Sequence, residues 1–136
     1  MNADGARMNV SLERARLNHL SGAVIGAAQK VSSTLGYGFL EKVYENSLCL
    51  ELRKRRIEVH QQFPLQVAYE AVVVGDYIPD LLIESCLIVE IKATPGIERA
   101  HRQQCLNYLR ASNLTLGLLL NFGHAHLEVG RAVHHF

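Results

Sequence analysis

The chain has 136 residues, a length that suits one domain, and its 49% hydrophobic content provides enough apolar surface for a core. Its formal net charge of +1 gives no general attraction to nucleic acid, although a local basic face remains compatible with that total. Because no run of about eighteen apolar residues occurs and the N-terminus lacks a signal-peptide pattern, we expect a cytoplasmic protein with no membrane partner.

The N-terminal third of the chain is predicted to form two helices. Apolar residues from Leu12 to Val31 recur at steps of three and four, which predicts a buried stripe on a helix over residues 11–34. Residues 1–10 are expected to form a disordered tail of a single domain that spans the whole chain. After a break at "LGYGF", the same periodicity predicts a second helix over residues 40–55.

From Ile57 onwards the apolar pattern changes to the period of a strand. Strands are predicted over residues 57–70, 72–83 and 86–93. Pro64 interrupts the first of them and therefore marks an edge or a bend, because proline cannot donate a ladder hydrogen bond.

The C-terminal part of the chain continues with a helix and two strands. The helix is predicted over residues 94–113, with Thr94 as its N-cap and Pro95 at its first helical position. Residues 114–123 form a continuous apolar run, which is typical of a strand covered on both faces, and residues 125–136 hold a short last strand. The order of elements predicts a compact α/β domain with helices packed on a mixed sheet.

Three charged residues stand inside the predicted strands, where charge is costly unless it is paired, solvated or bound. A three-residue hairpin loop at "ESC" would set Asp80 opposite Glu90, with Lys92 on the same face. Two opposed carboxylates repel, and a divalent cation such as Mg²⁺ would compensate them. Alternatively, Lys92 would bridge both acids as a structural ion pair. The residues by themselves leave both alternatives open.

Three short motifs occur in the order found in the PD-(D/E)xK superfamily of metal-dependent nucleases, which this chain resembles. They are "PD" at 79–80 with "EIK" at 90–92, "GFLEKVY" at 38–44 and "QCLNY" at 104–108. The second fits GxxExxY, which names a bacterial family assigned to this superfamily, and the third fits the QxxxY of RecB-type nucleases. The resemblance covers roughly residues 15–123.

The resemblance implies a restriction-endonuclease-like core of order αβββαβ, in which helices flank a central mixed sheet, with an extra N-terminal helix. It also implies hydrolysis of phosphodiester bonds with Mg²⁺ or Mn²⁺ as the cofactor. The implied metal ligands are Asp80, Glu90 and the backbone carbonyl of Ile91, and Lys92 would assist attack by water. The implied supporting residues are Glu41, an acid near the metal, and Gln104 and Tyr108, which would line the cleft and position substrate.

The implied partner is a nucleic acid, and we favour DNA over RNA. Sequence-independent binding would use cations on phosphates, for which Arg99 and Arg102 are the best placed because their helix also carries Gln104. A homodimer is compatible with the resemblance, since restriction-type members often pair. The alternative function is a non-catalytic module on the same fold that binds nucleic acid or another protein.

Overall fold

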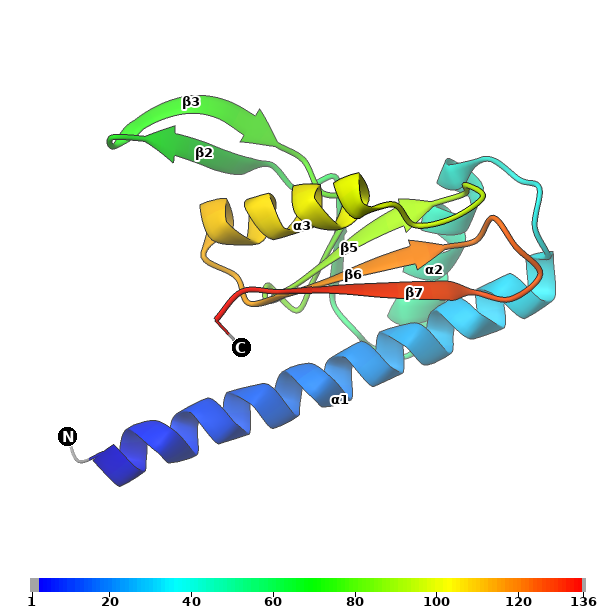
Figure 1. Ribbon diagram of the computed structural model, residues 1–136. Coiled ribbons are helices and arrows are strands. Elements are labelled where there is room, and N and C mark those ends of the chain that lie inside the picture. The colour runs from blue at the N-terminus through cyan, green and yellow to red at the C-terminus, as the bar shows by residue number, and fades with distance from the viewer. Residues whose placement is uncertain (1–2, 136) are drawn as a thin grey trace.

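The computed structural model describes residues 3–135 (Figure 1). Its elements are α1 (Ala3–Leu35), α2 (Glu41–Lys54), β1 (Val59–Gln61), β2 (Leu65–Tyr69), β3 (Val72–Tyr77), β4 (Leu81–Ile83), β5 (Leu87–Lys92), α3 (Arg99–Ser112), β6 (Leu116–Asn121) and β7 (Glu128–Val133). The central sheet has the order β1-β4-β5-β6-β7, in which β5 and β6 run parallel and the other neighbours run antiparallel. The prediction of an α/β fold with a central mixed sheet flanked by helices is confirmed.

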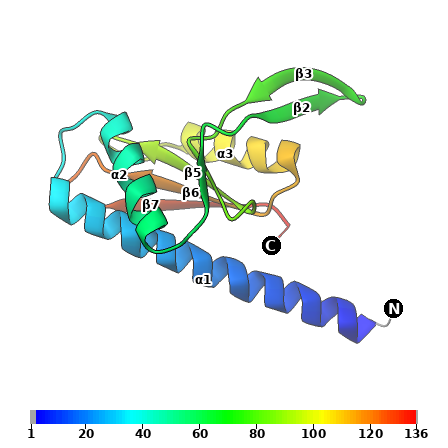
Figure 2. The same cartoon turned by 180° about the vertical axis from the view of Figure 1, so that it is seen from behind.

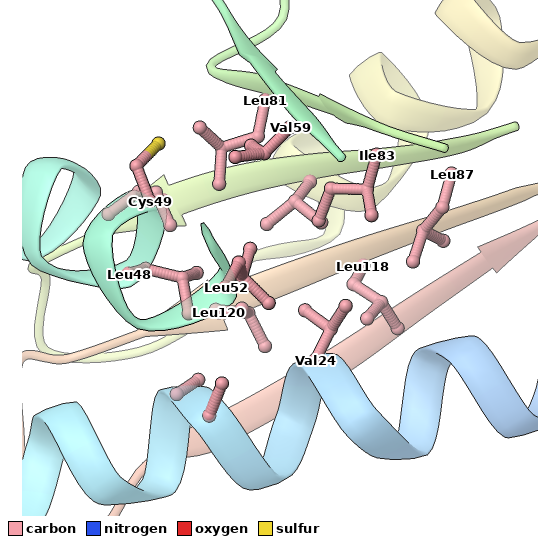
Figure 3. Close-up of a cluster of buried hydrophobic side chains, with 14 of the residues drawn as sticks. Val24, Leu48, Cys49, Leu52, Val59, Leu81, Ile83, Leu87, Leu118 and Leu120 are labelled. Carbon is pink, nitrogen blue, oxygen red and sulfur yellow. The ribbon is translucent and has the colours of Figure 1, made fainter. Parts of the chain in front are cut away.

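Helices cover both faces of the central sheet, with α1 and α2 on one face and α3 on the other (Figures 1 and 2). Successive residues of β5 serve the two faces: Ile91 belongs to the core under α1 and α2, whereas Ile88 belongs to the smaller core under α3. Figure 3 shows the larger core, where Val24 of α1 and Leu52 of α2 gather around Leu118 of β6. All six residues of β6 are buried, as predicted for a strand covered on both faces.

Two of the predicted strands are each divided in the structure, and a proline lies at each division. Residues 57–70 form β1 and β2 on either side of Pro64, and residues 72–83 form β3 and β4 on either side of Pro79. The interruption expected at Pro64 is thus present, whereas the prediction of a single strand over residues 72–83 was wrong, because Pro79 cannot donate to the ladder. Strands β1 and β4 enter the central sheet, while β2 and β3 form a separate antiparallel hairpin beside α3 (Figure 1).

Helix α1 begins at Ala3, so residues 3–10 of the expected disordered tail are helical, and residues 1–2 lie outside the described residues. This stretch contains no proline, and nothing in it stops the helix. Residues 7–16 are exposed, because this half of α1 extends past the sheet (Figure 1). Leu12, predicted to be buried, is therefore exposed, and the buried stripe starts at Leu17.

None of the helices in the described part of the chain combines the length and apolarity needed to cross a membrane.

Helix α3 begins later than predicted, at Arg99. Thr94 lies in the preceding loop instead of capping the helix, because the Asn121 side chain holds both its amide and its carbonyl at 3.0 Å. Glu98 is the N-cap, and its side chain forms a capping box with His101. The loop after β5 is thus tied to the end of β6, which fixes the strand ends beside the charged residues.

Candidate active site

The hairpin of β4 and β5 brings two carboxylates together. Its predicted register is confirmed, since Leu82 pairs with Ile88 across a three-residue turn. Asp80 lies directly before β4, and its amide donates a hydrogen bond to Oε1 of Glu90 at 3.2 Å. In return, Oδ2 of Asp80 accepts a hydrogen bond from the amide of Ile91 at 2.8 Å. The backbone therefore fixes both carboxylates in position.

Each carboxylate uses one oxygen for these bonds and leaves the other open. Within residues 3–135, no donor reaches Oδ1 of Asp80 or Oε2 of Glu90. Lys92 is partly buried on the same strand, yet among the described residues it forms no ion pair with either acid. The structure does not contain the ion-pair bridge that was the alternative explanation of the three charges.

The two carboxylates also differ from ordinary acids in their protonation. Burial raises the pKa of Glu90 to about 7, and the charge of Asp80 adds to this rise. Burial likewise raises the pKa of Asp80, although the hydrogen bond from the Ile91 amide opposes the rise. The pKa of Glu90 therefore favours its protonated form below about pH 7, and the charge of Lys92 only partly offsets the rise. A cation at the open oxygens would reverse this preference.

Tyr77, at the end of β3, is a site residue that sequence reasoning missed. Its hydroxyl donates a short hydrogen bond to Oε1 of Glu90. Its ring stacks on that of Tyr108 in α3, within 8° of parallel, and Nε2 of Gln104 donates to the Tyr108 hydroxyl at 3.1 Å. Gln104 and Tyr108 thus reach the acidic site through Tyr77. The available signal was only the position of this tyrosine three residues before Asp80.

Helix α2 places Glu41 at the same end of β5. Oε1 of Glu41 accepts a hydrogen bond from the amide of Ala93 at 3.3 Å, one residue beyond Lys92. The charges of Glu41 and Glu45 both contribute to the raised pKa of Asp80. The acidic residues of the helix and of the strands therefore share one electrostatic environment.

Glu45 is a second residue that sequence reasoning missed. It is buried, pairs with Lys42 at 2.9 Å and accepts a hydrogen bond from Nε2 of Gln61 at 2.8 Å. Gln62 also donates to it through its side chain, while the Gln62 amide donates to the carbonyl of Asp80 at 3.0 Å. Glu45 thus supports the turn that leads Asp80 into the sheet. The indication in the sequence was that Glu45 lies one helical turn after Glu41 and therefore on the same face of the helix.

Tyr44, the last residue of "GFLEKVY", is a fully buried core residue. Its ring stacks on Phe122 with 4.7 Å between centroids. Its hydroxyl donates to the carbonyl of Gly36 at 2.7 Å and accepts from the amide of Phe39 at 3.2 Å. The tyrosine of this motif therefore holds the loop before α2, and in this way it fixes where Glu41 starts the helix.

The structure does not bring Arg99 and Arg102 to the carboxylates. Both line a groove between α3 and β7 together with Arg131, whose carbonyl accepts a hydrogen bond from Nη1 of Arg102 at 3.4 Å. Tyr108 instead faces β3, on another side of α3. Phosphate contacts by the two arginines would therefore lie away from the acidic site.

The atoms that could hold a metal ion at this site are all oxygens. They are the open oxygens of Asp80 and Glu90, and the carbonyl of Ile91, which faces the same strand edge as the amide bound to Asp80. Such a donor set suits Mg²⁺ or Mn²⁺, since Mg²⁺ is typically held by one or two carboxylates plus water and substrate phosphate. No cluster of three or more His, Cys, Asp or Glu side chains arranged for a metal occurs within the described residues. Water and substrate would have to complete the coordination.

Comparison with known proteins adds one finding. The family model of the PD-(D/E)XK nuclease superfamily matches residues 18–132, which include both carboxylates, Lys92 and helix α3. No curated protein and no solved structure matches the chain.

Proposed function

Because this chain belongs to the PD-(D/E)XK nuclease superfamily, we propose that it is a metal-dependent nuclease that hydrolyses phosphodiester bonds. The observation that carries the proposal is the carboxylate pair of Asp80 and Glu90, which backbone amides hold while one oxygen of each stays open. Lys92 stands on the same strand and, within the described residues, is not engaged in an ion pair with them. This combination is what a site that binds a cation and a phosphate would require.

In the proposed chemistry, a few residues each have a separate role. Asp80, Glu90 and the carbonyl of Ile91 would hold Mg²⁺ or Mn²⁺, which would supply Lewis acidity and lower the pKa of a bound water. Lys92 would orient the attacking water and stabilise the negative charge that develops on the phosphate. Glu41 would hold the loop after β5 through the Ala93 amide and add negative charge.

We propose that the remaining residues contact the substrate. Gln104 and Tyr108 would line the cleft beside Tyr77. Arg99 and Arg102 would contact phosphates farther along the nucleic-acid strand. DNA is favoured over RNA as the substrate, and the cytoplasm is the proposed location. The motif at 38–44 supports placing the chain among the GxxExxY proteins of the superfamily. A homodimer would enlarge the surface that grips a duplex.

A non-catalytic module that binds nucleic acid or another protein is the second candidate function. It is favoured by the small donor set, because the two carboxylates of the pair are joined by no third acidic, histidine or cysteine ligand within residues 3–135. On this alternative, replacing Asp80 or Glu90 by alanine would leave the function of the protein intact.

Cleavage assays with Mn²⁺ on labelled single-stranded, duplex and branched DNA test the proposal. We expect the wild type to cut at least one substrate, and Lys92→Met to lower the rate by roughly 10²–10³-fold, the loss typical for removing one electrostatic stabiliser. Lys54→Met is the matched control, because Lys54 is an exposed lysine at the far end of α2. Undiminished cleavage by Lys92→Met would exclude a catalytic role for Lys92, and a wild type inactive on every substrate would favour the non-catalytic module.

A further inference from the structure

The loop between α1 and α2 exposes large apolar side chains beside the candidate active site. Tyr37 is 64% exposed, Phe39 is 48% exposed and Leu40 is 81% exposed. Apolar surface in contact with water is unfavourable, and a contiguous exposed patch on a small protein marks a site of interaction. We therefore asked which ligand this loop could receive.

The loop is held rigidly although its side chains are exposed. The Tyr44 hydroxyl binds the carbonyl of Gly36 and the amide of Phe39, and the Phe39 ring lies edge-on to that of Tyr44 at 6.2 Å. Gly36 and Gly38 have φ angles of 73° and 111°, a region that favours glycine, and they stand on either side of the exposed tyrosine. Because the backbone of the loop is fixed in this way, binding a ligand there would cost little further backbone entropy.

The same loop adjoins the acidic residues. Leu40 is the N-cap of α2, and the next residue, Glu41, accepts the hydrogen bond from Ala93 at the end of β5. Ala93 lies three residues beyond Glu90, a distance of about 10 Å along a strand. The loop and the end of β5 lie at the same end of the molecule (Figures 1 and 2). A nucleic-acid strand with one phosphate at the carboxylates would therefore bring an adjacent base within reach of the loop.

We propose that Tyr37 and Phe39 form a stacking platform for unpaired nucleobases, so that the substrate is a single strand or a duplex with a splayed end. This inference rests on the proposed nuclease function, because it uses the carboxylate site to place the phosphate. Every base has a π-face that can stack on an aromatic ring, whereas the bases inside a duplex already stack on one another. The charge of Glu41 repels phosphates but not uncharged bases, which favours a base over the backbone at this loop.

Fluorescence anisotropy with labelled oligothymidylate and with a blunt duplex, in Ca²⁺, tests the platform. We expect Tyr37→Ala and Phe39→Ala each to weaken single-strand binding by roughly 5–100-fold, the usual range for one lost base stack, and to leave duplex affinity within about twofold. Phe39→Trp keeps an aromatic ring at this position and should therefore bind the single strand like the wild type. Tyr69→Ala is the matched control, because Tyr69 is 67% exposed on the separate β2–β3 hairpin, and it should bind like the wild type.

Several results would overturn the platform: unchanged single-strand affinity in both alanine variants, an equal loss on single strand and duplex, or no oligonucleotide binding by the wild type. Loss of self-association in the alanine variants, without loss of single-strand binding, would identify the loop as an interface between copies and would also overturn the platform.

The platform and the nuclease function can each fail without the other. A wild type that binds single strands through Tyr37 and Phe39 but never cuts them contradicts the nuclease alone, and cutting with unchanged binding in the variants contradicts the platform alone.

Discussion

Glu90 is the residue on which the proposed chemistry of the site depends most. Its Oε1 accepts hydrogen bonds from the Tyr77 hydroxyl and the Asp80 amide, and both bonds lower its pKa. Burial and the charge of Asp80 outweigh them, so that the pKa lies at about 7. Because a metal ion binds the charged carboxylate, we expect affinity for Mn²⁺ to fall as the pH drops below about 7.

A second prediction about a single residue concerns the Tyr77 hydroxyl. Tyr77→Phe removes one bond that favours the charged form of Glu90, so the pKa of Glu90 should rise further and Mn²⁺ affinity at pH 7 should fall by roughly tenfold. Tyr108→Phe, which keeps the stacked ring and loses only the bond from Gln104, should bind within about twofold of the wild type. Calorimetric titration at several pH values measures both. Equal affinity of Tyr77→Phe and the wild type from pH 6 to pH 8 would contradict this role for Tyr77.

Between elements, the loops after β5 and β6 approach each other closely at Gly123. A Cβ added at Gly123 would stand 2.1 Å from the backbone carbonyl oxygen of Thr94, so one loop would have to move. We expect Gly123→Ala to lower the free energy of unfolding by about 1–3 kcal/mol, as overpacking usually does. Gly22→Ala is the control: a Cβ at this position of α1 meets nothing within 4 Å, so it should raise that free energy by about 0.5–1 kcal/mol. Urea unfolding compares the two, and a Gly123→Ala variant as stable as the wild type would show that this contact is not tight.

Local patterns predicted the elements well where their cause is local. The alternation in β5, the apolar run of β6 and the short turn between β4 and β5 depend on neighbours in the sequence, and they placed Asp80 opposite Glu90. Pro64 and Pro79 are local signals of where the two strands divide, but which sheet each half joins depends on partners far along the chain, so periodicity could not reveal it. The start of α3 likewise depends on Asn121, which holds Thr94 from 27 residues away. Tyr77 was missed for the same reason, since it meets Glu90 only because β3 leaves the central sheet.

The whole molecule must tolerate two partly buried acids at its sheet, and this sets how its stability depends on pH. The pKa of Glu90 is about 7 in the folded chain against an ordinary value of 4.5, so the folded state holds the proton more tightly than the unfolded state. Its stabilising contribution is fully present below about pH 4.5 and is lost as the pH rises towards 7. The raised pKa of Asp80 acts in the same direction.

Urea unfolding of the metal-free protein at pH 5 and pH 7.5 tests this dependence. Relative to Glu90→Gln, which cannot ionise at this position, the wild type should lose on the order of 3 kcal/mol between the two pH values. The acids with lowered pKa, Glu51 and Glu128, are present in both proteins and cancel in the comparison. Mn²⁺ at pH 7.5 should restore stability to the wild type and not to the variant. Parallel pH profiles for the two proteins would contradict the raised pKa of Glu90.

The central claim is that Asp80 and Glu90 form a cation site, and calorimetric titration of Mn²⁺ into the protein at pH 7.5 tests it most directly. The wild type should bind the ion and Asp80→Ala should not. Asp76→Ala should bind like the wild type, because Asp76 is an exposed acid on β3. The titration is repeated with a non-hydrolysable oligonucleotide, which lets a substrate phosphate complete the coordination. Equal binding by Asp80→Ala and the wild type, or no binding by the wild type even with the oligonucleotide, would contradict the claim.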